Sequence, residues 1–117
     1  MHNLILLFGS NLGDKQAHIG QALNVCVDEL GELVSQSSLY ETAPWGNLSQ
    51  DVFFNQVVHL QTQLQPQEVL QTVLSIEQRL GRIRHEKWGA RIIDIDILYF
   101  DDLVIQSADL TIPHPLV

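Results

Sequence analysis

The longest apolar run in the chain reads Leu4-Ile5-Leu6-Leu7-Phe8, and Gly9 follows it directly. A continuous apolar run of strand length, with no polar residue in alternation, is typical of a central strand that is buried on both faces. The run is far too short to cross a bilayer, which takes about 20 apolar residues. We therefore expect a sheet that is built outward from residues 4–8.

Two stretches with helical spacing are expected to lie on this sheet. The first follows a turn at residues 9–14 and ends at Gly31, and its apolar stripe consists of Ile19, Ala22, Leu23, Cys26, Val27 and Leu30. The second begins at Pro66, a residue that suits the first helical position, and ends at Gly81. Its stripe consists of Val69, Val73, Ile76 and Leu80. Each pattern predicts an amphipathic helix with one face on a sheet.

Further strands are predicted by β-rich composition and by alternation. They are Leu33–Thr42, Phe53–Thr62, Ile92–Phe100 and, after a turn at Asp101-Asp102, the short segment Leu103–Ile105 that pairs back. Two polar stretches, residues 43–51 and 82–91, are predicted as loops. Loops of this length in a small domain are often functional.

The resulting order β-α-β-β-α-β predicts an α+β fold of the ferredoxin-like kind, a sandwich in which two helices lie on one face of an antiparallel sheet. A chain of 117 residues fits one domain, residues 1–117. The first residues show no basic segment followed by a long apolar stretch, so no secretory signal is expected. The single cysteine, Cys26, is consistent with a reducing compartment, and we expect a cytoplasmic protein.

The charge distribution narrows the choice of ligand. The net charge of −8 argues against nucleic acid or an anionic membrane as a partner, because phosphates would be repelled on average. Five of the six basic residues nevertheless fall within thirteen positions: Arg79, Arg82, Arg84, Lys87 and Arg91. This local cluster indicates one small anionic ligand, and a solvated charged loop is the alternative reading.

Two acidic residues alternate with isoleucine directly after the basic segment. In a strand, Asp94 and Asp96 would point to one face, with Cα atoms roughly 6 to 7 Å apart, and the isoleucines to the other. An exposed acidic face is the plain explanation of such a pair. The neighbouring arginines favour a different one, because a divalent cation between two carboxylates, with arginines beside it, is the chemistry that phosphoryl transfer needs.

The other candidate site residues give weaker evidence of function when each is taken alone. Phe53 and Asn55 would project from one strand face, so that a ring could stack on a planar ligand and an amide could pair with a heterocycle, although Phe-x-Asn is a common strand pattern. Trp88 is either a loop anchor or a ligand contact. Nothing local decides the role of Glu77, and His114 is either a phosphate contact or a turn residue.

Taken together, these residues resemble the 6-hydroxymethyl-7,8-dihydropterin pyrophosphokinase family over nearly the whole chain. The matching motifs, in order, are Gly9-Ser10-Asn11-Leu12-Gly13, Tyr40-Glu41-Thr42-Ala43-Pro44, Phe53-Phe54-Asn55, Glu77, Leu80-Gly81-Arg82 with Arg84, the signature Lys87 to Leu98, and Ile112-Pro113-His114-Pro115. The resemblance implies transfer of the terminal pyrophosphate of ATP to the hydroxymethyl group of the pterin in folate biosynthesis. ATP would be the co-substrate, and two Mg²⁺ ions would be held by Asp94 and Asp96.

The resemblance also assigns the remaining roles. The catalytic set would be Arg82, Arg84, Asp94 and Asp96. The pterin would contact Thr42, Pro44, Trp45, Phe53, Asn55 and Trp88, with Phe53 stacked on its ring. The nucleotide would contact Glu77, Arg84, Trp88, Arg91, Ile97, Thr111 and His114.

The chain also departs from the family pattern. Members usually continue beyond the Pro-His-Pro region with another strand, which supplies a second stacking aromatic and a further phosphate-binding arginine, whereas this sequence stops at Val117. Asp109 stands where some members carry a basic residue. We expect a monomeric enzyme; the alternative is a non-catalytic pterin- or nucleotide-binding domain on the same fold. A sugar-nucleotide transferase is disfavoured, because no glycine-rich βαβ dinucleotide motif is present.

Overall fold

The computed structural model describes residues 1–43, 52–81 and 92–115. Its elements, in chain order, are β1 (His2–Ser10), α1 (Lys15–Glu29), β2 (Gly31–Gln36), β3 (Tyr40–Thr42), β4 (Phe53–Thr62), α2 (Pro66–Arg79), β5 (Asp94–Phe100), β6 (Ile105–Gln106) and β7 (Thr111–Ile112). Both predicted helices are present, and the predicted strand Phe53–Thr62 has the same bounds as β4. In the described residues, neither helix is long and apolar enough to span a membrane.

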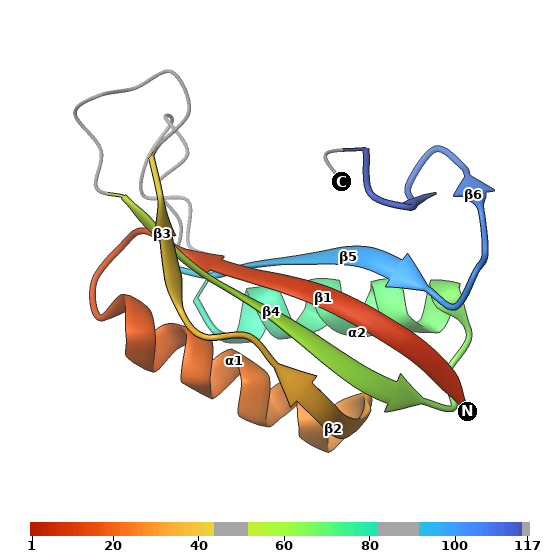
Figure 1. The fold of residues 1–117 in the computed structure, drawn as a ribbon, viewed down its shortest axis with the longest axis horizontal. Helices are drawn as coiled ribbons and strands as arrows, with labels where there is room; N and C mark the ends of the chain where they lie inside the picture. Colours follow the sequence, from red (N-terminus) through yellow and green to blue (C-terminus); the bar gives the residue numbers. More distant parts are fainter. Residues whose placement is uncertain (44–51, 82–91, 116–117) are drawn as a thin grey trace.

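The main sheet is antiparallel and has the strand order β2-β4-β1-β5, with β3 also paired to β4. The apolar run that begins at Leu4 therefore lies in an inner strand, as predicted. The prediction that it is buried on both faces was wrong, because Ile5 and Leu7, which alternate with the buried Leu4, Leu6 and Phe8, are only partly buried. Both helices lie on one face of this sheet and contact each other (Figure 1). The chain thus has an α/β architecture in which one face of the sheet is covered by helices and the other carries none among the described residues.

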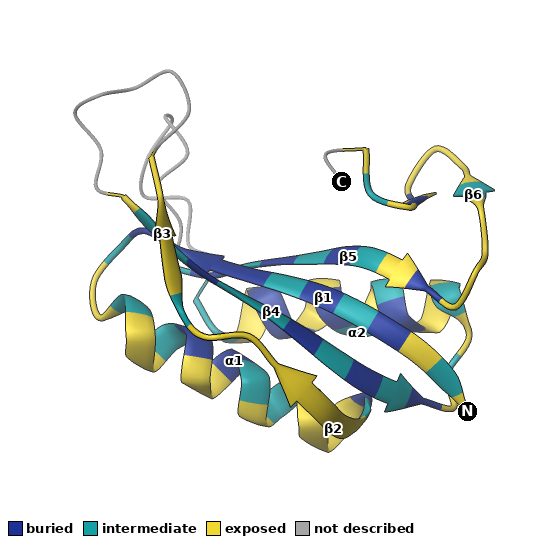
Figure 2. Cartoon of the chain, in the orientation of Figure 1, coloured by how far each residue is buried: buried dark blue, intermediate teal, exposed yellow. Residues whose placement is uncertain are grey.

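The core lies between the sheet and the helices (Figure 2). Its largest fully buried side chains include Phe8 and Phe100 from the sheet and Ile19 and Ile76 from the helices. Cys26 is buried in the same cluster, and this burial raises the pKa of its thiol to about 12. The thiol therefore stays protonated at neutral pH. Val27, which the helical stripe included, is instead exposed.

The helix ends follow local sequence signals. The Asp14 side chain accepts a hydrogen bond of 3.2 Å from Ala17 N and caps α1, and the Glu68 side chain accepts one of 2.9 Å from Gln65 N at the start of α2. An ion pair joins the helices, since the Arg79 guanidinium donates to both carboxylate oxygens of Glu29 at 2.6 and 2.7 Å. This pair holds the pKa of Glu29 below its usual value.

Several predicted boundaries were wrong. The strand predicted over Leu33–Thr42 starts earlier, at Gly31, and is split into β2 and β3. At the split, Val57 N donates to the Ser37 hydroxyl at 3.0 Å and Ser37 N donates to Val57 O at 2.8 Å, so a side chain replaces part of the regular ladder. The first strand also runs past Gly9 to Ser10.

The C-terminal part of the described chain differs from the prediction as well. Residues Leu103–Ile105 do not pair back onto the sheet; β6 pairs with β7 in a separate two-stranded ladder. The segment then returns beside β5, where His114 N donates to Leu98 O at 3.0 Å. Strands of two residues have too few positions to show alternation, so the sequence could not reveal this pairing.

The turn after β5 gives a prediction of pH dependence. Asp101, at φ 49°, accepts 2.7 Å hydrogen bonds from Asn3 N and from His2 Nδ1, and these interactions lower its pKa from the ordinary value of 3.8. A carboxyl whose pKa is lower in the folded state than in the unfolded chain stabilises the fold at pH values above its unfolded-state pKa. This stabilisation is lost as the pH falls through the pKa of the folded state. We expect Asp101→Asn, which tolerates the same backbone conformation, to lose less stability than the parent between pH 6 and pH 3 in urea unfolding. Equal losses in both proteins would contradict this assignment.

Candidate active site

The site begins with rows of residues that run across the sheet. Gly9 in β1 is paired with Asn55 in β4 on one side and with Asp94 in β5 on the other. In the next row, Leu7 is paired with Val57 and with Asp96. Directly paired residues of an antiparallel sheet point to the same face, so these two rows form a shared floor.

The two aspartates lie on the face away from the helices. Ile93, Ile95 and Ile97 are buried at 5% exposure or less, whereas Asp94 and Asp96 are half-buried. This is the alternation that the sequence predicts for a strand packed on one face. The carboxylates are therefore held by a well-packed strand and are accessible from solvent.

The first cavity, of about 420 Å³, lies over the floor on the side of β3 and β4. Its lining consists of Leu7, Gly9, Tyr40, Thr42, Ala43, Phe53, Asn55, Asp94 and Asp96. Asn55 Nδ2 donates to Thr42 Oγ1 at 2.9 Å, which fixes the orientation of the amide. A Cβ atom on Gly9 would lie 3.5 Å from Asn55 Oδ1 and 3.6 Å from Phe53 Cδ1. The missing side chain at Gly9 thus keeps the space between ring and amide open.

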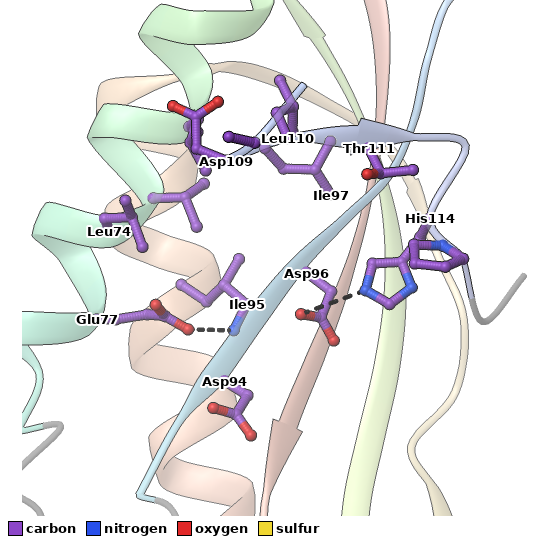
Figure 3. A pocket seen from close by; sticks show the side chains of 14 residues that line it. Leu74, Glu77, Asp94, Ile95, Asp96, Ile97, Asp109, Leu110, Thr111 and His114 are labelled. Carbon is purple, nitrogen blue, oxygen red and sulfur yellow. Dashed lines mark hydrogen bonds and ion pairs between the residues drawn. The ribbon is translucent and has the colours of Figure 1, made fainter. Parts of the chain in front are cut away.

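The second cavity, of about 530 Å³, lies beyond β5, between α2 and the segment that contains β7 (Figure 3). It has an apolar wall made of Leu70, Val73, Leu74 and Leu110. Its polar lining consists of Glu77, Asp94, Asp96, Asp109, Thr111 and His114. His114 Nε2 lies 3.8 Å from Asp96 Oδ1, which places the imidazole at the acidic end of the cavity.

The two cavities meet at the aspartates. Among the described residues, Asp94 and Asp96 are the only ones that line both. Both volumes are in the usual range for small-molecule sites. The arrangement therefore suits two ligands that approach one pair of carboxylates from opposite sides.

Charge near the carboxylates is strongly negative in the described part of the chain. The second cavity is lined there by four carboxylates and no lysine or arginine. Of the six basic residues, only two are described: Arg79 is paired with Glu29, and Lys15 Nζ lies 5.1 Å from the centre of the Phe54 ring. An anionic ligand here needs cations from elsewhere, either a metal ion or the basic residues of the segment 82–91.

The predicted site residues fall into three groups. Thr42, Phe53 and Asn55 line the first cavity, and Glu77, Ile97, Thr111 and His114 line the second, with Asp94 and Asp96 between them. Pro44, Trp45, Arg82, Arg84, Trp88 and Arg91 lie outside the described residues. Leu7 and the apolar wall of the second cavity were not predicted, because their place depends on how distant elements pack.

Glu77, on which the sequence was undecided, is buried at 6% exposure. Its Oε2 atom accepts a 2.8 Å hydrogen bond from Ile95 N, between the two aspartates (Figure 3). Neither periodicity nor composition gave a signal for this contact, because it joins α2 to β5 across 18 positions of sequence.

The chain is similar to known proteins over its whole length. The family model described as 7,8-dihydro-6-hydroxymethylpterin-pyrophosphokinase (HPPK) matches residues 5–117. A 2-amino-4-hydroxy-6-hydroxymethyldihydropteridine pyrophosphokinase of Methylorubrum extorquens is 40% identical over 100% of this chain and 75% of its own length. The enzyme of the same name from Bacillus subtilis is 38% identical over 98% of this chain and 70% of its own length.

Solved structures agree on the fold. A crystal structure of HPPK-DHPS in complex with substrates matches 89% of this chain with a TM-score of 0.72 at 19% identity, and the matched part is 29% of that longer chain. Plasmodium falciparum HPPK-DHPS matches 89% of this chain and 29% of its own, with a TM-score of 0.69. Together with the sequence match over residues 5–117, these findings show that the chain belongs to the 7,8-dihydro-6-hydroxymethylpterin-pyrophosphokinase family.

Proposed function

We propose that this protein transfers the terminal pyrophosphate of ATP to the hydroxymethyl group of 6-hydroxymethyl-7,8-dihydropterin, a step of folate biosynthesis, and releases AMP. The observation that carries this proposal is that two cavities of ligand size meet at one pair of carboxylates, Asp94 and Asp96. Family membership supports it, because curated relatives bear the name of this pyrophosphokinase.

We assign the fold to the ferredoxin-like class. The main-sheet order β2-β4-β1-β5 places the four long strands of the βαββαβ unit in the order second-third-first-fourth, with both helices on one face. This is the arrangement expected for a split βαβ unit. It matters for function, because the first and last strands become neighbours and bring Gly9 next to Asp94.

We assign the first cavity to the pterin. Phe53 offers a ring face for stacking, and Asn55, whose Nδ2 is committed to Thr42, offers Oδ1 to a donor on the edge of the heterocycle. Gly9 leaves the floor beside them without a side chain. The hydroxymethyl group would then point toward Asp94 and Asp96, the residues that also line the second cavity.

We assign the second cavity to ATP. The apolar wall from α2 and Leu110 suits the adenine base, and the polar end at Asp96 and His114 suits the phosphates. Ile97 and Thr111 also line this cavity and are assigned to the nucleotide. The triphosphate would then extend toward the pterin cavity rather than away from it.

The donor set fits magnesium. In the described residues, no group of three or more His, Cys, Asp or Glu side chains forms a protein-only metal site, and Mg²⁺ typically takes one or two carboxylates and completes its shell with water and substrate phosphates. Asp94 and Asp96 would hold the ions, two in number by the family resemblance. When bound, magnesium supplies positive charge that offsets the phosphate charge.

The reaction exchanges one P–O bond for another and releases the proton of the attacking hydroxyl to solvent. The hydroxyl oxygen of the pterin bonds to the β-phosphorus of ATP, the bond from that phosphorus to the oxygen bridging to the α-phosphate breaks, and AMP leaves while the hydroxyl proton is lost. The residues of the two cavities contribute by holding both substrates in line for this displacement. Arg82 and Arg84 remain predicted catalytic arginines over the triphosphate. Arg84, Trp88 and Arg91 remain predicted contacts of ATP, and Pro44, Trp45 and Trp88 remain predicted contacts of the pterin.

The identity of the nucleotide product tests the proposal. Incubation with ATP, Mg²⁺ and 6-hydroxymethyl-7,8-dihydropterin should yield AMP and the pterin diphosphate in equal amounts, with no ADP, when the products are separated by ion-exchange chromatography. Formation of ADP would contradict pyrophosphate transfer. Binding of both substrates with no AMP would favour the non-catalytic alternative.

We also expect the protein to be a monomer and to be located in the cytoplasm. Light scattering on the purified protein tests the oligomeric state.

Asn55 provides a test of the pterin assignment. Removing its amide in Asn55→Ala should raise KM for the pterin about tenfold or more, because a lost hydrogen bond in a partly buried site costs about 1–3 kcal/mol. KM for ATP should change less than threefold. Gln56→Ala removes a similar amide that does not line the cavity and serves as the control. An equal effect on both substrates would argue against a pterin-specific contact.

A further inference from the structure

The outer edge of β5 carries a specific polar contact from α2. Within residues 1–43, 52–81 and 92–115, β5 pairs with β1 on one side only, so alternate backbone groups of β5 face outward without a strand partner from this part of the chain. At Ile95 this outward N–H donates to Glu77 Oε2 at 2.8 Å. Both residues are buried, with exposures of 4% and 6%. A charged acceptor makes a short, strong hydrogen bond with such a group.

The location of Glu77 is unfavourable for a carboxylate in three respects. It lies in the last turn of α2, where the helix dipole disfavours negative charge, and it is buried, where an ionised group loses hydration. It also lines the same cavity as Asp94 and Asp96, whose charges repel it. An apolar side chain could pack here without these costs but could not accept the hydrogen bond from Ile95 N.

The hydrogen bond acts at the residue between the two aspartates. On its inner side β5 is fixed by the ladder to β1, in which Asp94 is paired with Gly9 and Asp96 with Leu7. On its outer side Glu77 holds the backbone at Ile95. A shift of this backbone would displace both carboxylates together, because Asp94 and Asp96 are the chain neighbours of Ile95.

We propose that Glu77 is a positioning residue: it fixes the backbone of β5 from its outer side, and thereby sets where Asp94 and Asp96 present their carboxylates to the two substrates. The family resemblance predicted a nucleotide contact for Glu77, whereas the geometry assigns it to the strand that bears the aspartates. The expected effect of Glu77 on the rate of the reaction rests on the proposed function, whereas its expected effect on the position of the β5 backbone does not.

Two variants separate the hydrogen bond from the charge. Glu77→Met has a similar length and no strong acceptor, and Glu77→Gln keeps an acceptor and removes the charge. Gln78→Met, at an exposed position of the same helical turn, is the control. The first measurement is amide hydrogen exchange at Ile95, followed by NMR without substrate or metal. We expect exchange about tenfold faster or more in Glu77→Met, and substantial recovery of protection in Glu77→Gln.

The second measurement is steady-state kinetics of AMP release. Glu77→Met should lower kcat about tenfold or more while KM for ATP changes less than threefold, since displaced groups impair the reaction more than binding. The kcat of Glu77→Gln should exceed that of Glu77→Met at least about fivefold.

Three results would overturn the proposal. They are unchanged Ile95 exchange in Glu77→Met, equal losses in the methionine and glutamine variants, and a rise in KM for ATP with unchanged kcat, which would restore the nucleotide contact. Failure of the parent protein to release AMP would refute the proposed function instead, and the exchange comparison would still decide whether Glu77 holds the strand.

Discussion

Asp96→Ala is expected to reduce AMP release by about 10²- to 10³-fold or more, which is the range found when one group that stabilises transition-state charge is removed. The reason is that Asp96 belongs to both cavities, so its loss affects each substrate at the point where they meet. The fold should remain intact, because the side chain is 46% exposed and its removal relieves repulsion with Asp94. Initial rates of AMP formation and thermal unfolding followed by circular dichroism test the two halves of the prediction.

The control for this variant is Asp102→Ala. Asp102 is an exposed carboxylate in the turn after β5 and lines neither cavity. Asp102→Ala changes the net charge by the same amount as Asp96→Ala. Because Asp102 lines neither cavity, the rate should stay within about twofold of the parent, as is usual for surface substitutions. A near-normal rate in Asp96→Ala would remove this residue from the catalytic set.

The largest effect on stability is expected for Gly31→Ala. A Cβ atom at this position would lie 1.9 Å from the backbone oxygen of Gln61 in β4, and backbone cannot move aside as a flexible side chain can. We expect a loss of about 3 kcal/mol or more in the free energy of unfolding, at the upper end for overpacked sites. Chemical denaturation with urea measures this loss.

Gly20→Ala is the matched control. Gly20 lies inside α1, and a Cβ atom there would meet nothing within 4 Å. The same substitution should therefore stabilise the protein by about 0.5–1 kcal/mol, the usual advantage of alanine over glycine within a helix. If Gly31→Ala were tolerated as well as Gly20→Ala, the close approach of β2 to β4 would be wrong.

The sequence predicted those parts of the fold that repeat a pattern over many residues. The two helical stripes and the alternation of β4 each extend over at least ten positions, and all three elements were found at the expected places. The break between β2 and β3 was missed because the hydroxyl of Ser37 enters the ladder, a substitution that alternation cannot show. The pairing of β6 with β7 was missed because each strand has two residues.

In the candidate site, too, local patterns could be predicted from the sequence and long-range packing could not. Alternation alone placed Asp94 and Asp96 on the accessible face of a strand, since the intervening isoleucines must be buried. The meeting of two cavities at these residues depends on β1 lying between β4 and β5, which is a long-range property of the fold. The burial of Glu77 likewise follows from packing of α2 against β5, and a single helical pattern cannot reveal it.

Asp94 and Asp96 would, on this proposal, hold the divalent cation on which joint binding of the two substrates depends. Isothermal titration of 6-hydroxymethyl-7,8-dihydropterin into protein saturated with a non-hydrolysable ATP analogue, with and without Mg²⁺, measures this most directly. We predict tight pterin binding only when both Mg²⁺ and the analogue are present, and loss of this dependence in Asp96→Ala. Pterin affinity that is the same with and without Mg²⁺, or that stays Mg²⁺-dependent in Asp96→Ala, would contradict the claim.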